Sequence, residues 1–459
     1  MGSLDLFEKV RQAFAGDTFL IVGFGRWTGP AAARFFERCG LPYAVSDCLP
    51  ARELAARCVG FSPLRIHGGP QSVDHLAGVT QVLLSPGVPR SASPAAEAVA
   101  AGIPVWGDLD LLLPLLSRPR LAGITGTDGK TTTVTLLGEI CARFGATVVC
   151  GNNGVPVMET AAVLDAADFA VVEVSSFMLE ETRRLRFDAG VILNVAEDHV
   201  DRYPDPGDYL RAKLNLLRHL RPTDVFVRNA DDPLLRDVVP PTGQVRDFGL
   251  STGLFDPAAD AFVFEGRRLP VAQCRLRGRQ FIPDVLAALA VAEAWGLAPE
   301  PVLDAVRGFP GVPHRFQDAG GAGGVRLIDD SKATTVQAVS AALASCPAGE
   351  TVVILGGREK HLDFSPLREA TARLAGAICY GEAGARIRDQ LARPDAACVF
   401  DFREAVRLAC ARVPAPGVVL LSPGCTSWDQ FESYEVRGHV FAEEGLRALS
   451  ERFAPGEAP

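Results

Sequence analysis

The stretch from Leu121 to Thr133, LAGITGTDGKTTT, constrains the fold of this chain more than any other. It begins with an apolar run typical of a buried strand, and the residues that follow it have apolar side chains at helical spacing. A strand, a glycine-rich turn and a helix N-terminus together make an anion site, because backbone N–H groups and the helix dipole point at the turn. The stretch therefore predicts a phosphate-binding loop in an α/β protein.

The loop itself is GTDGKTT, from Gly126 to Thr132. The strict P-loop pattern needs a glycine five residues before the glycine of GK, and Ile124 stands there. The loop is thus a variant, and its plainest alternative is a glycine-rich turn with an exposed Lys. The strand–loop–helix context favours a nucleoside triphosphate, with Lys130 supplying a positive charge and Thr131 reaching a Mg²⁺ ion.

Length and composition limit the class of protein. A chain of 459 residues is too long for one ordinary core, so we expect two or three domains. With 48% apolar residues, 22% charged residues and a net charge of −9, the chain has the composition of a soluble enzyme, and it lacks the Lys/Arg blocks of nucleic-acid binders. We see no membrane span or secretory signal, and the eleven Cys without a C-x-x-C pair predict reduced thiols in a cytoplasm.

The N-terminal region has the pattern of a nucleotide-binding unit. A predicted strand, Thr18 to Phe24, leads into the turn Gly23 to Gly29, which is one residue too long for G-x-G-x-x-G. Asp47 ends the next strand, where a dinucleotide fold places its ribose-binding acid, and Ser85 ends another strand on the ligand edge of the sheet. NAD, a related nucleotide and a purely structural turn all stay open for this region.

Strands alternate with helices through the rest of the chain, which predicts parallel or mostly parallel sheets. The segments Ala101 to Arg120 and Gly308 to Pro313 are rich in Pro or Gly and are the predicted connections between domains. Beyond the phosphate loop, the predicted strands are Thr147 to Cys150, Phe169 to Val174, Gly190 to Val195, Val325 to Ile328, Thr351 to Leu355, Ala377 to Tyr380 and Val418 to Leu421.

Polar residues that could perform chemistry follow several of these strands. Glu173, at a strand end, is a plausible ligand of Mg²⁺ or of its water, although it could equally be a carboxylate without a role. The string from Glu197 to Arg202 packs two Asp, a Glu, a His and an Arg within six residues, a density more typical of a site than of a solvated turn. Lys213 lies on a predicted helix, Pro206 to Leu220, and by itself would be a surface residue.

The last third of the chain carries three cations at loop positions. Arg315 begins the segment, Lys332 follows an apolar strand within Asp-Ser-Lys-Ala-Thr, and Lys360 follows the pair Gly356-Gly357. Each alone is unremarkable, but together on the ligand edges of one domain they predict a face that clamps a carboxylate or a γ-phosphate.

A series of motifs resembles the Mur ligase family along essentially the whole chain. In the family's order they are GTDGKTT, GNNGVP, EVSSFMLE, NVAEDHVDRY, HRF, DDSKAT, GGREK and LSPGCTSWDQF. Folylpolyglutamate synthases resemble only the central and last parts. The resemblance implies an α/β fold of three domains: an N-terminal Rossmann-like domain for a UDP-sugar (1–106), a central P-loop domain with a parallel sheet for ATP (107–312), and a C-terminal Rossmann-like domain for an amino acid (313–459).

The resemblance also implies an activity. It points to the member that uses ATP to join D-glutamate to UDP-N-acetylmuramoyl-L-alanine through an acyl phosphate, in the synthesis of peptidoglycan precursors. The implied partners are these small molecules, with no nucleic acid and no membrane, and the protein is expected to be a monomer in the cytoplasm. A Mur-type ligase with a different amino acid or nucleotide is the first alternative, and a non-catalytic nucleotide-binding regulator is the second.

Site residues carry over position by position from this resemblance. The implied ATP contacts are Gly126, Thr127, Asp128, Gly129, Lys130, Thr131, Thr132, Arg315 and Asp330. The implied ligands of two Mg²⁺ ions are Thr131, Glu173, His199 and a carbamylated Lys213. The implied contacts to the nucleotide sugar and the amino acid are Asp47, Ser85, Asn152, Lys332, Thr334, Lys360, Ser427 and Tyr434. Among all of these, Lys130, His199, Lys213 and Lys332 are the expected catalytic residues.

Three features depart from the family's pattern. Gln280 to Asp284 stands where the family has His-Asn-x-x-Asn, with an Asn at the adenine. The N-terminal glycine turn is longer by one residue and carries Arg26 and Trp27, and Asp128 replaces a common Asn in the phosphate loop. Because of these departures, a diverged member of the family with a different acceptor, donor or nucleotide stays an alternative.

Overall fold

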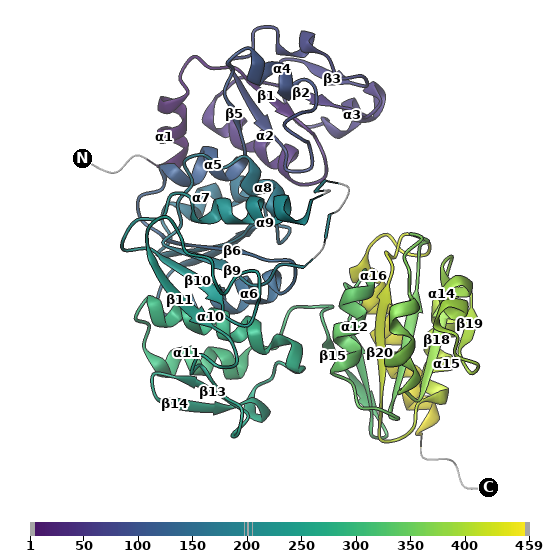
Figure 1. Cartoon of the computed structure of the whole chain (residues 1–459). Coiled ribbons are helices and arrows are strands. Elements are labelled where there is room, and N and C mark those ends of the chain that lie inside the picture. Colours follow the sequence, from purple (N-terminus) through teal and green to yellow (C-terminus); the bar gives the residue numbers. More distant parts are fainter. Residues whose placement is uncertain (1–4, 197, 200–201, 204, 455–459) are drawn as a thin grey trace, which may run out of the picture. The chain divides into compact units, whose positions relative to one another are not determined.

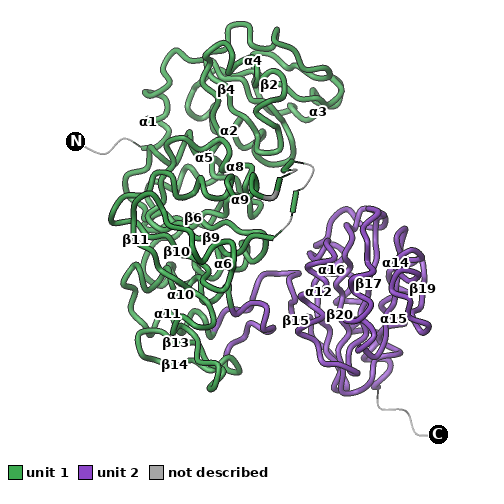
Figure 2. The backbone as a smooth tube through the Cα atoms, in the orientation of Figure 1, with its two compact units in different colours: residues 1–273, 283–307 green, residues 274–282, 308–459 purple. Residues whose placement is uncertain are grey.

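The computed structural model describes residues 5–196, 198–199, 202–203 and 205–454. The chain divides into two compact units, residues 1–273 with 283–307 and residues 274–282 with 308–459 (Figure 2). Both units are built on sheets flanked by helices, and three of the four sheets among the described residues are parallel or mostly parallel. The predicted α/β class is therefore confirmed.

The first sheet of the first unit consists of five parallel strands, which occupy the N-terminal part of the chain (Figure 1). In spatial order they are β3 (Ile66–Gly68), β2 (Tyr43–Asp47), β1 (Phe19–Val22), β4 (Gln81–Leu84) and β5 (Val105–Trp106). The helices of this part are α1 (Leu6–Ala13), α2 (Thr28–Cys39), α3 (Ala51–Arg57) and α4 (Ala95–Ala100). The order 3-2-1-4-5 reverses direction between β1 and β4, and ligands of open α/β sheets bind at such a switch point.

The second sheet has six parallel strands and holds the phosphate loop. In spatial order they are β11 (Gln244–Phe248), β10 (Val225–Asn229), β9 (Ala189–Ile192), β6 (Arg120–Thr125), β8 (Phe169–Glu173) and β7 (Thr147–Gly151). The helices of this part are α5 (Asp108–Leu112), α6 (Lys130–Cys141), α7 (Ala161–Leu164), α8 (Ser176–Glu180), α9 (Pro206–Leu214), α10 (Ile282–Ala294) and α11 (Pro299–Gly308). Strand β8 is buried at every position, as expected for a parallel strand covered on both faces.

Several details of this part differ from the prediction. Strands β10 and β11 were not predicted, and β9 ends at Ile192 rather than Val195. Helix α9 ends at Leu214 rather than Leu220, because the chain tightens there into a 3₁₀ turn, Asn215–Leu217, whose leucines continue the apolar pattern. A small antiparallel sheet of β12 (Phe255–Asp256), β13 (Ala261–Phe264) and β14 (Arg267–Pro270) was not predicted. Its strands have two to four residues, which is too short for a clear periodicity.

The second unit is a six-stranded sheet in which only the edge strand β15 runs antiparallel. In spatial order its strands are β15 (Gln317–Ala322), β16 (Val325–Asp329), β20 (Gly417–Gly424), β17 (Thr351–Gly356), β18 (Gly376–Tyr380) and β19 (Ala397–Val399). Its helices are α12 (Val336–Ala344), α13 (Arg368–Ala372), α14 (Gly384–Leu391), α15 (Phe402–Arg412) and α16 (Tyr434–Arg452). Last in sequence but central in the sheet, β20 puts the residues after it next to those after β16 and β17.

Within the described part of the chain, no helix combines the length and the apolar character needed to cross a bilayer. All eleven Cys are free thiols, and most of them are buried.

Candidate active site

The phosphate loop lies between β6 and α6, as the sequence predicts. Gly129 is the N-cap of α6 and has a left-handed backbone with φ of 83°. A Cβ atom at this position would overlap the carboxylate of Asp284, which is buried at the start of α10. Both the backbone conformation and the close approach therefore require glycine. Asp284, the last residue of the stretch Gln280 to Asp284 that departs from the family's pattern, therefore packs against the phosphate loop.

Asn194 holds the loop in place through its side chain. Its Oδ1 atom accepts hydrogen bonds from the N–H groups of Thr127 (3.1 Å) and Asp128 (2.9 Å), and its Nδ2 atom donates to the Asp128 carbonyl (3.2 Å). The side chain of Asp128 is exposed, so this residue is fixed in the loop by its main chain. Sequence reasoning did not single out Asn194, although it opens the motif NVAEDHVDRY.

Two lysines meet at the loop. The Nζ atom of Lys130 donates to the carbonyls of Gly126 (2.8 Å) and Thr127 (2.7 Å). Lys213, on α9 and only 1% exposed, donates to the Gly126 carbonyl (2.9 Å) and lies 4.2 Å from the ring centre of Tyr209. Burial, and then the nearby charge of Lys130, lower the pKa of Lys213 to about 7. Lys213 is thus a buried amine at the phosphate loop, unlike an ordinary surface lysine.

A buried carboxylate ends the strand next to the loop. Glu173 closes β8, and its Oε1 atom accepts a hydrogen bond from the Nδ2 atom of Asn152 (3.0 Å). The Asn152 N–H also donates to the Glu173 carbonyl (2.9 Å), so the two residues are fixed to each other. The Oε2 atom of Glu173 is buried without a hydrogen-bond partner among the described residues. An unpaired buried carboxylate oxygen is costly unless a cation binds it, so this position fits a Mg²⁺ ligand.

The other predicted metal ligands are only partly described. His199 has a left-handed backbone (φ of 53°) and lies 4.7 Å from Phe177, ring centre to ring centre. Of the string from Glu197 to Arg202, Glu197, Val200 and Asp201 lie outside the described residues. Across the described ranges, no group of three His, Cys, Asp or Glu side chains is arranged to hold a metal ion. The ligand set of Thr131, Glu173, His199 and Lys213 stays a prediction.

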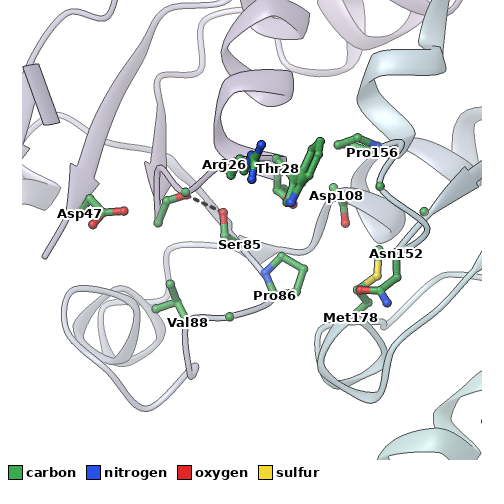
Figure 3. Close-up of a pocket in the computed structure, with 16 residues that line it drawn as sticks. Arg26, Thr28, Asp47, Ser85, Pro86, Val88, Asp108, Asn152, Pro156 and Met178 are labelled. Atoms are coloured by element: carbon green, nitrogen blue, oxygen red, sulfur yellow. Dashed lines mark hydrogen bonds between the residues drawn. The ribbon is translucent and has the colours of Figure 1, made fainter. Parts of the chain in front are cut away.

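A cavity of about 440 Å³ opens at the carboxyl ends of β1 and β4, where the first sheet reverses its strand order (Figure 3). The cavity is lined by Gly23, Gly25, Arg26, Trp27, Thr28, Asp47, Ser85, Pro86, Gly87, Val88, Asp108, Gly151, Asn152, Gly154, Pro156 and Met178. Two of the predicted substrate residues, Asp47 and Ser85, therefore share it with a third, Asn152. It continues to the pair of Asn152 with Glu173, the buried carboxylate beside the phosphate loop.

The polar groups in the cavity brace the glycine turn. Asp47 accepts hydrogen bonds from the N–H groups of Phe24 (2.5 Å) and Leu49 (3.0 Å). The Ser85 hydroxyl donates to the Gly23 carbonyl (2.6 Å), which ties the end of β4 to the end of β1. The shape of the cavity mouth therefore depends on both predicted residues, and their contact with a nucleotide sugar stays a prediction.

In the second unit, the predicted residues gather at the carboxyl edge of the sheet. Lys332 follows β16, and its Nζ atom lies 5.2 Å from the ring centre of Tyr434, the first residue of α16. The Nζ atom of Lys360 donates to the Thr334 carbonyl (3.1 Å). Ser427 is buried in the loop after β20. Four of the predicted amino-acid contacts thus lie on loops that follow strands of this unit, and the fifth, Tyr434, begins α16.

Asp330, the predicted ATP contact after β16, is buried. Its carboxylate accepts hydrogen bonds from the Ser422 hydroxyl (2.8 Å) and from the Phe316 N–H (3.1 Å). Burial outweighs these bonds and raises the pKa of Asp330 to about 7. The group therefore changes charge near neutral pH. Arg315, the other predicted ATP contact of this unit, precedes Phe316.

A buried arginine, which sequence reasoning missed, joins two of these loops. Arg437 on α16 is fully buried, and its guanidinium donates to the Ser331 hydroxyl (2.9 Å) and carbonyl (2.7 Å). It also donates to the Cys425 carbonyl and the Tyr380 hydroxyl, each at 3.1 Å. Ser331 precedes Lys332, and Cys425 lies two residues before Ser427. Arg437 therefore fixes the loop after β16 and the loop after β20 through hydrogen bonds in the interior of the unit.

These features define a class of protein. A phosphate loop with two lysines and a buried carboxylate, joined to a cavity at the switch point of a second parallel sheet, is the site of a nucleotide-dependent α/β enzyme. Comparison with known proteins gives the family. The model of the Mur ligase middle domain matches residues 124–292, and that of the Mur ligase glutamate ligase domain matches residues 314–425.

Individual proteins similar to this chain are ligases of the same family. The chain is 37% identical to UDP-N-acetylmuramoylalanine–D-glutamate ligase of Hahella chejuensis, over 94% of this chain and 98% of that protein. It is 36% identical to the ligase of the same name from Geobacter metallireducens, over 97% and 99%. Among solved structures, MurF ligase from Thermotoga maritima in complex with ADP has a similar fold, with a TM-score of 0.60 and 18% identity over 83% of this chain and 92% of that one. The chain belongs to the Mur ligase family.

Proposed function

We propose that this protein joins D-glutamate to UDP-N-acetylmuramoyl-L-alanine at the expense of ATP, in the cytoplasm and as a monomer. The observation that carries the proposal is the 37% identity, over nearly the full length of both chains, to a ligase named for that reaction. The geometry supports the same reaction, because a cavity suited to a nucleotide sugar ends beside a phosphate loop.

The proposal assigns one role to each of three domains. Residues 1–106 would bind the UDP-sugar in a Rossmann-like fold, residues 107–312 would bind ATP in a P-loop fold, and residues 313–459 would bind the amino acid in a second Rossmann-like fold. The 3-2-1-4-5 strand order of the first sheet and the loop between β6 and α6 support the first two assignments. The assignment of the amino-acid-binding domain is supported by the residues at the edge of its sheet, Lys332, Thr334, Lys360, Ser427 and Tyr434.

In the proposed first step, the alanyl carboxylate attacks the γ-phosphoryl group of ATP, which yields an acyl phosphate and ADP. Asp47 and Ser85 would lie at the nucleotide end of the bound sugar, and Asn152 would orient the carboxylate at the other end. The Nζ atom of Lys130 would exchange its hydrogen bonds to the carbonyls of Gly126 and Thr127 for contacts with the β- and γ-phosphates. Arg315 and Asp330 would contact ATP from the phosphates to the ribose. Negative charge grows on the transferred group, so fixed cations and N–H groups supply most of the stabilisation.

In the second step, the amine of D-glutamate attacks the acyl carbon, a tetrahedral intermediate forms, and phosphate leaves as the amide bond closes. Lys332 and Lys360 would hold the two carboxylates of the amino acid, since both are cations on loops at one sheet edge. Thr334, Ser427 and Tyr434 would complete the contacts.

Two Mg²⁺ ions are part of the proposal, with Thr131 and Glu173 at the first, and His199 with Lys213 at the second. The ions would neutralise charge on the phosphates. The unpaired Oε2 atom of Glu173 supports the first site. Lys213 would act as a ligand after carbamylation, which replaces a cation by an anionic oxygen donor. Its burial next to Lys130 supports this, because such surroundings favour the neutral amine that reacts with CO₂.

The test is ADP release from ATP, Mg²⁺ and UDP-N-acetylmuramoyl-L-alanine with a panel of amino acids. D-Glutamate should give the highest kcat/KM and L-glutamate little turnover. A preference for another amino acid would assign the chain to a different Mur-type ligase. Binding of ATP without any substrate-dependent turnover would instead indicate a regulator.

A further inference from the structure

The glycine turn after β1 carries an exposed aromatic side chain. Its sequence, Gly23-Phe-Gly-Arg-Trp-Thr-Gly29, has one residue more than the G-x-G-x-x-G pattern. The extra length places Arg26 and Trp27 immediately before α2, and both line the 440 Å³ cavity. Trp27 is 55% exposed, although it is the largest apolar side chain of the turn. Because Trp27 both lines the cavity and remains exposed, its indole offers a large apolar surface that a bound ligand can cover.

Arg26 holds one side of the indole. Its guanidinium carbon lies 5.3 Å from the centre of the Trp27 ring, within the range of a cation–π contact. With one face of the ring occupied by Arg26, the remaining exposed surface can receive a flat or apolar group. The pair therefore presents a cation and an aromatic surface next to each other at the cavity.

The position of the pair along the cavity indicates which part of the ligand it meets. Asp47 and Asn152 lie at opposite ends of the cavity, with Arg26, Thr28 and Ser85 between them (Figure 3). In a nucleotide fold the diphosphate lies at the N-terminus of the helix that follows the first strand, which here is α2 and begins at Thr28. A nucleotide sugar with its base toward Asp47 and its reacting group toward Asn152 has its hexose directly after the diphosphate. Trp27 is the N-cap of α2, so it lies beside the diphosphate, within reach of the hexose that follows it.

We propose that Trp27 is a stacking surface for the hexose ring of the nucleotide sugar, with Arg26 fixing the indole and facing the diphosphate. This role of Trp27 rests on the proposed function, because it requires that the ligand of the cavity is a UDP-sugar. Hexose rings present apolar C–H groups on one face, and an indole offers them a large, rigid contact area. With Arg26 holding its ring, Trp27 is a specificity residue that raises the affinity for a UDP-sugar above the affinity for UDP.

Calorimetric binding of UDP and of UDP-N-acetylglucosamine to the full chain tests the proposal without catalysis. In Trp27→Ala the affinity for UDP should stay within about twofold of the wild type, while that for UDP-N-acetylglucosamine should fall roughly tenfold, the loss of one well-packed aromatic contact. Trp27→Phe should recover most of the loss. Trp428→Ala is the matched control, since Trp428 is 63% exposed in the other unit, and it should bind both ligands as the wild type does.

Each other outcome has a definite meaning. An equal loss of affinity for UDP and for UDP-N-acetylglucosamine would place Trp27 at the base or ribose and overturn the assignment to the hexose. Unchanged affinity for both would overturn any contact with the ligand. If the wild-type chain binds neither ligand but releases ADP with UDP-N-acetylmuramoyl-L-alanine and D-glutamate, the role of Trp27 falls and the proposed function stands. If it neither binds these ligands nor turns over, both fall. Wild-type binding with an unchanged Trp27→Ala variant contradicts the role of Trp27 alone.

Discussion

Lys130 and Lys213 donate hydrogen bonds to the same acceptor, the carbonyl oxygen of Gly126, at 2.8 and 2.9 Å. The two residues come from different helices and are 83 positions apart in the chain. Burial, and then the repulsion between two ammonium groups at one oxygen, lower the pKa of Lys213 to about 7. The contact links the phosphate loop to the residue that we propose as a carbamylated metal ligand.

Lys130→Ala should abolish turnover. The variant removes the cation proposed for the β- and γ-phosphates, so we expect kcat to fall by about a hundredfold or more, as when a donor to a developing oxyanion is removed. Lys9→Ala is the control, because Lys9 is bonded to Asp165 and lies outside the proposed site. ADP release under saturating substrates measures both. Turnover above a tenth of the wild-type rate in Lys130→Ala would remove the assignment.

Lys213→Ala should lose activity and regain part of it when a short carboxylate such as formate or acetate is added. The small anion would take the place of the carbamate next to the metal. Lys130→Ala, which lacks a cation instead of an anion, should not respond to the same additive. Full activity of Lys213→Ala without any additive would contradict the carbamate.

Glu173→Gln should raise the Mg²⁺ concentration that gives half-maximal activity, by about tenfold or more, because the amide replaces an anionic oxygen at the metal. The hydrogen bond from Asn152 can be kept, since the amide oxygen still accepts. Chelation of Mg²⁺ by EDTA should stop the wild-type enzyme. A Mg²⁺ titration that is the same for both proteins would show that Glu173 is no ligand.

Asp330→Asn should change how stability depends on pH. The carboxyl of Asp330 has a pKa of about 7 in the folded chain and an ordinary value of 3.8. The folded state therefore favours the protonated form, so this group lowers the free energy of unfolding as pH rises from about 4 to 7 and has a constant effect above that. Denaturant unfolding at several pH values should show the variant gaining stability relative to the wild type across this window. A constant difference between the two proteins would contradict the raised pKa.

Arg437→Met should destabilise the protein, because buried acceptors at Ser331, Cys425 and Tyr380 lose their donor. At about 1–3 kcal/mol for each acceptor left without a partner, we expect the lowest unfolding transition of the full chain to drop by several degrees. Arg437→Lys should recover part of this and, in addition, show a raised KM for D-glutamate with an unchanged KM for ATP, since it disturbs the loops that carry Lys332 and Ser427. The exposed Arg236→Met is the control for stability and should leave the transition in place. A wild-type transition in Arg437→Met would contradict the structural role.

Much of the fold follows from local pattern. Apolar runs predicted most of the parallel strands to within one to three residues, as at Val325–Asp329 and Thr351–Gly356, because a strand covered on both faces needs a continuous apolar segment. The parallel strands β3, β5, β10, β11 and β19 were not predicted. The same reasoning failed at β12 to β14, whose few residues show no periodicity. It also extended α9 too far, because Leu216 and Leu217 stay buried after the helix has ended.

The site divides in the same way. The sequence by itself determined the phosphate loop, the strand-end carboxylate Glu173 and the motif series of the family, since each is a short run of neighbouring residues. The structure alone decided that Lys213 is buried against Gly126, that Arg437 fastens two loops from behind, and that Trp27 stands exposed at the cavity. These contacts join residues far apart in the chain or depend on what covers a side chain. They are therefore set by tertiary packing, which no local pattern encodes.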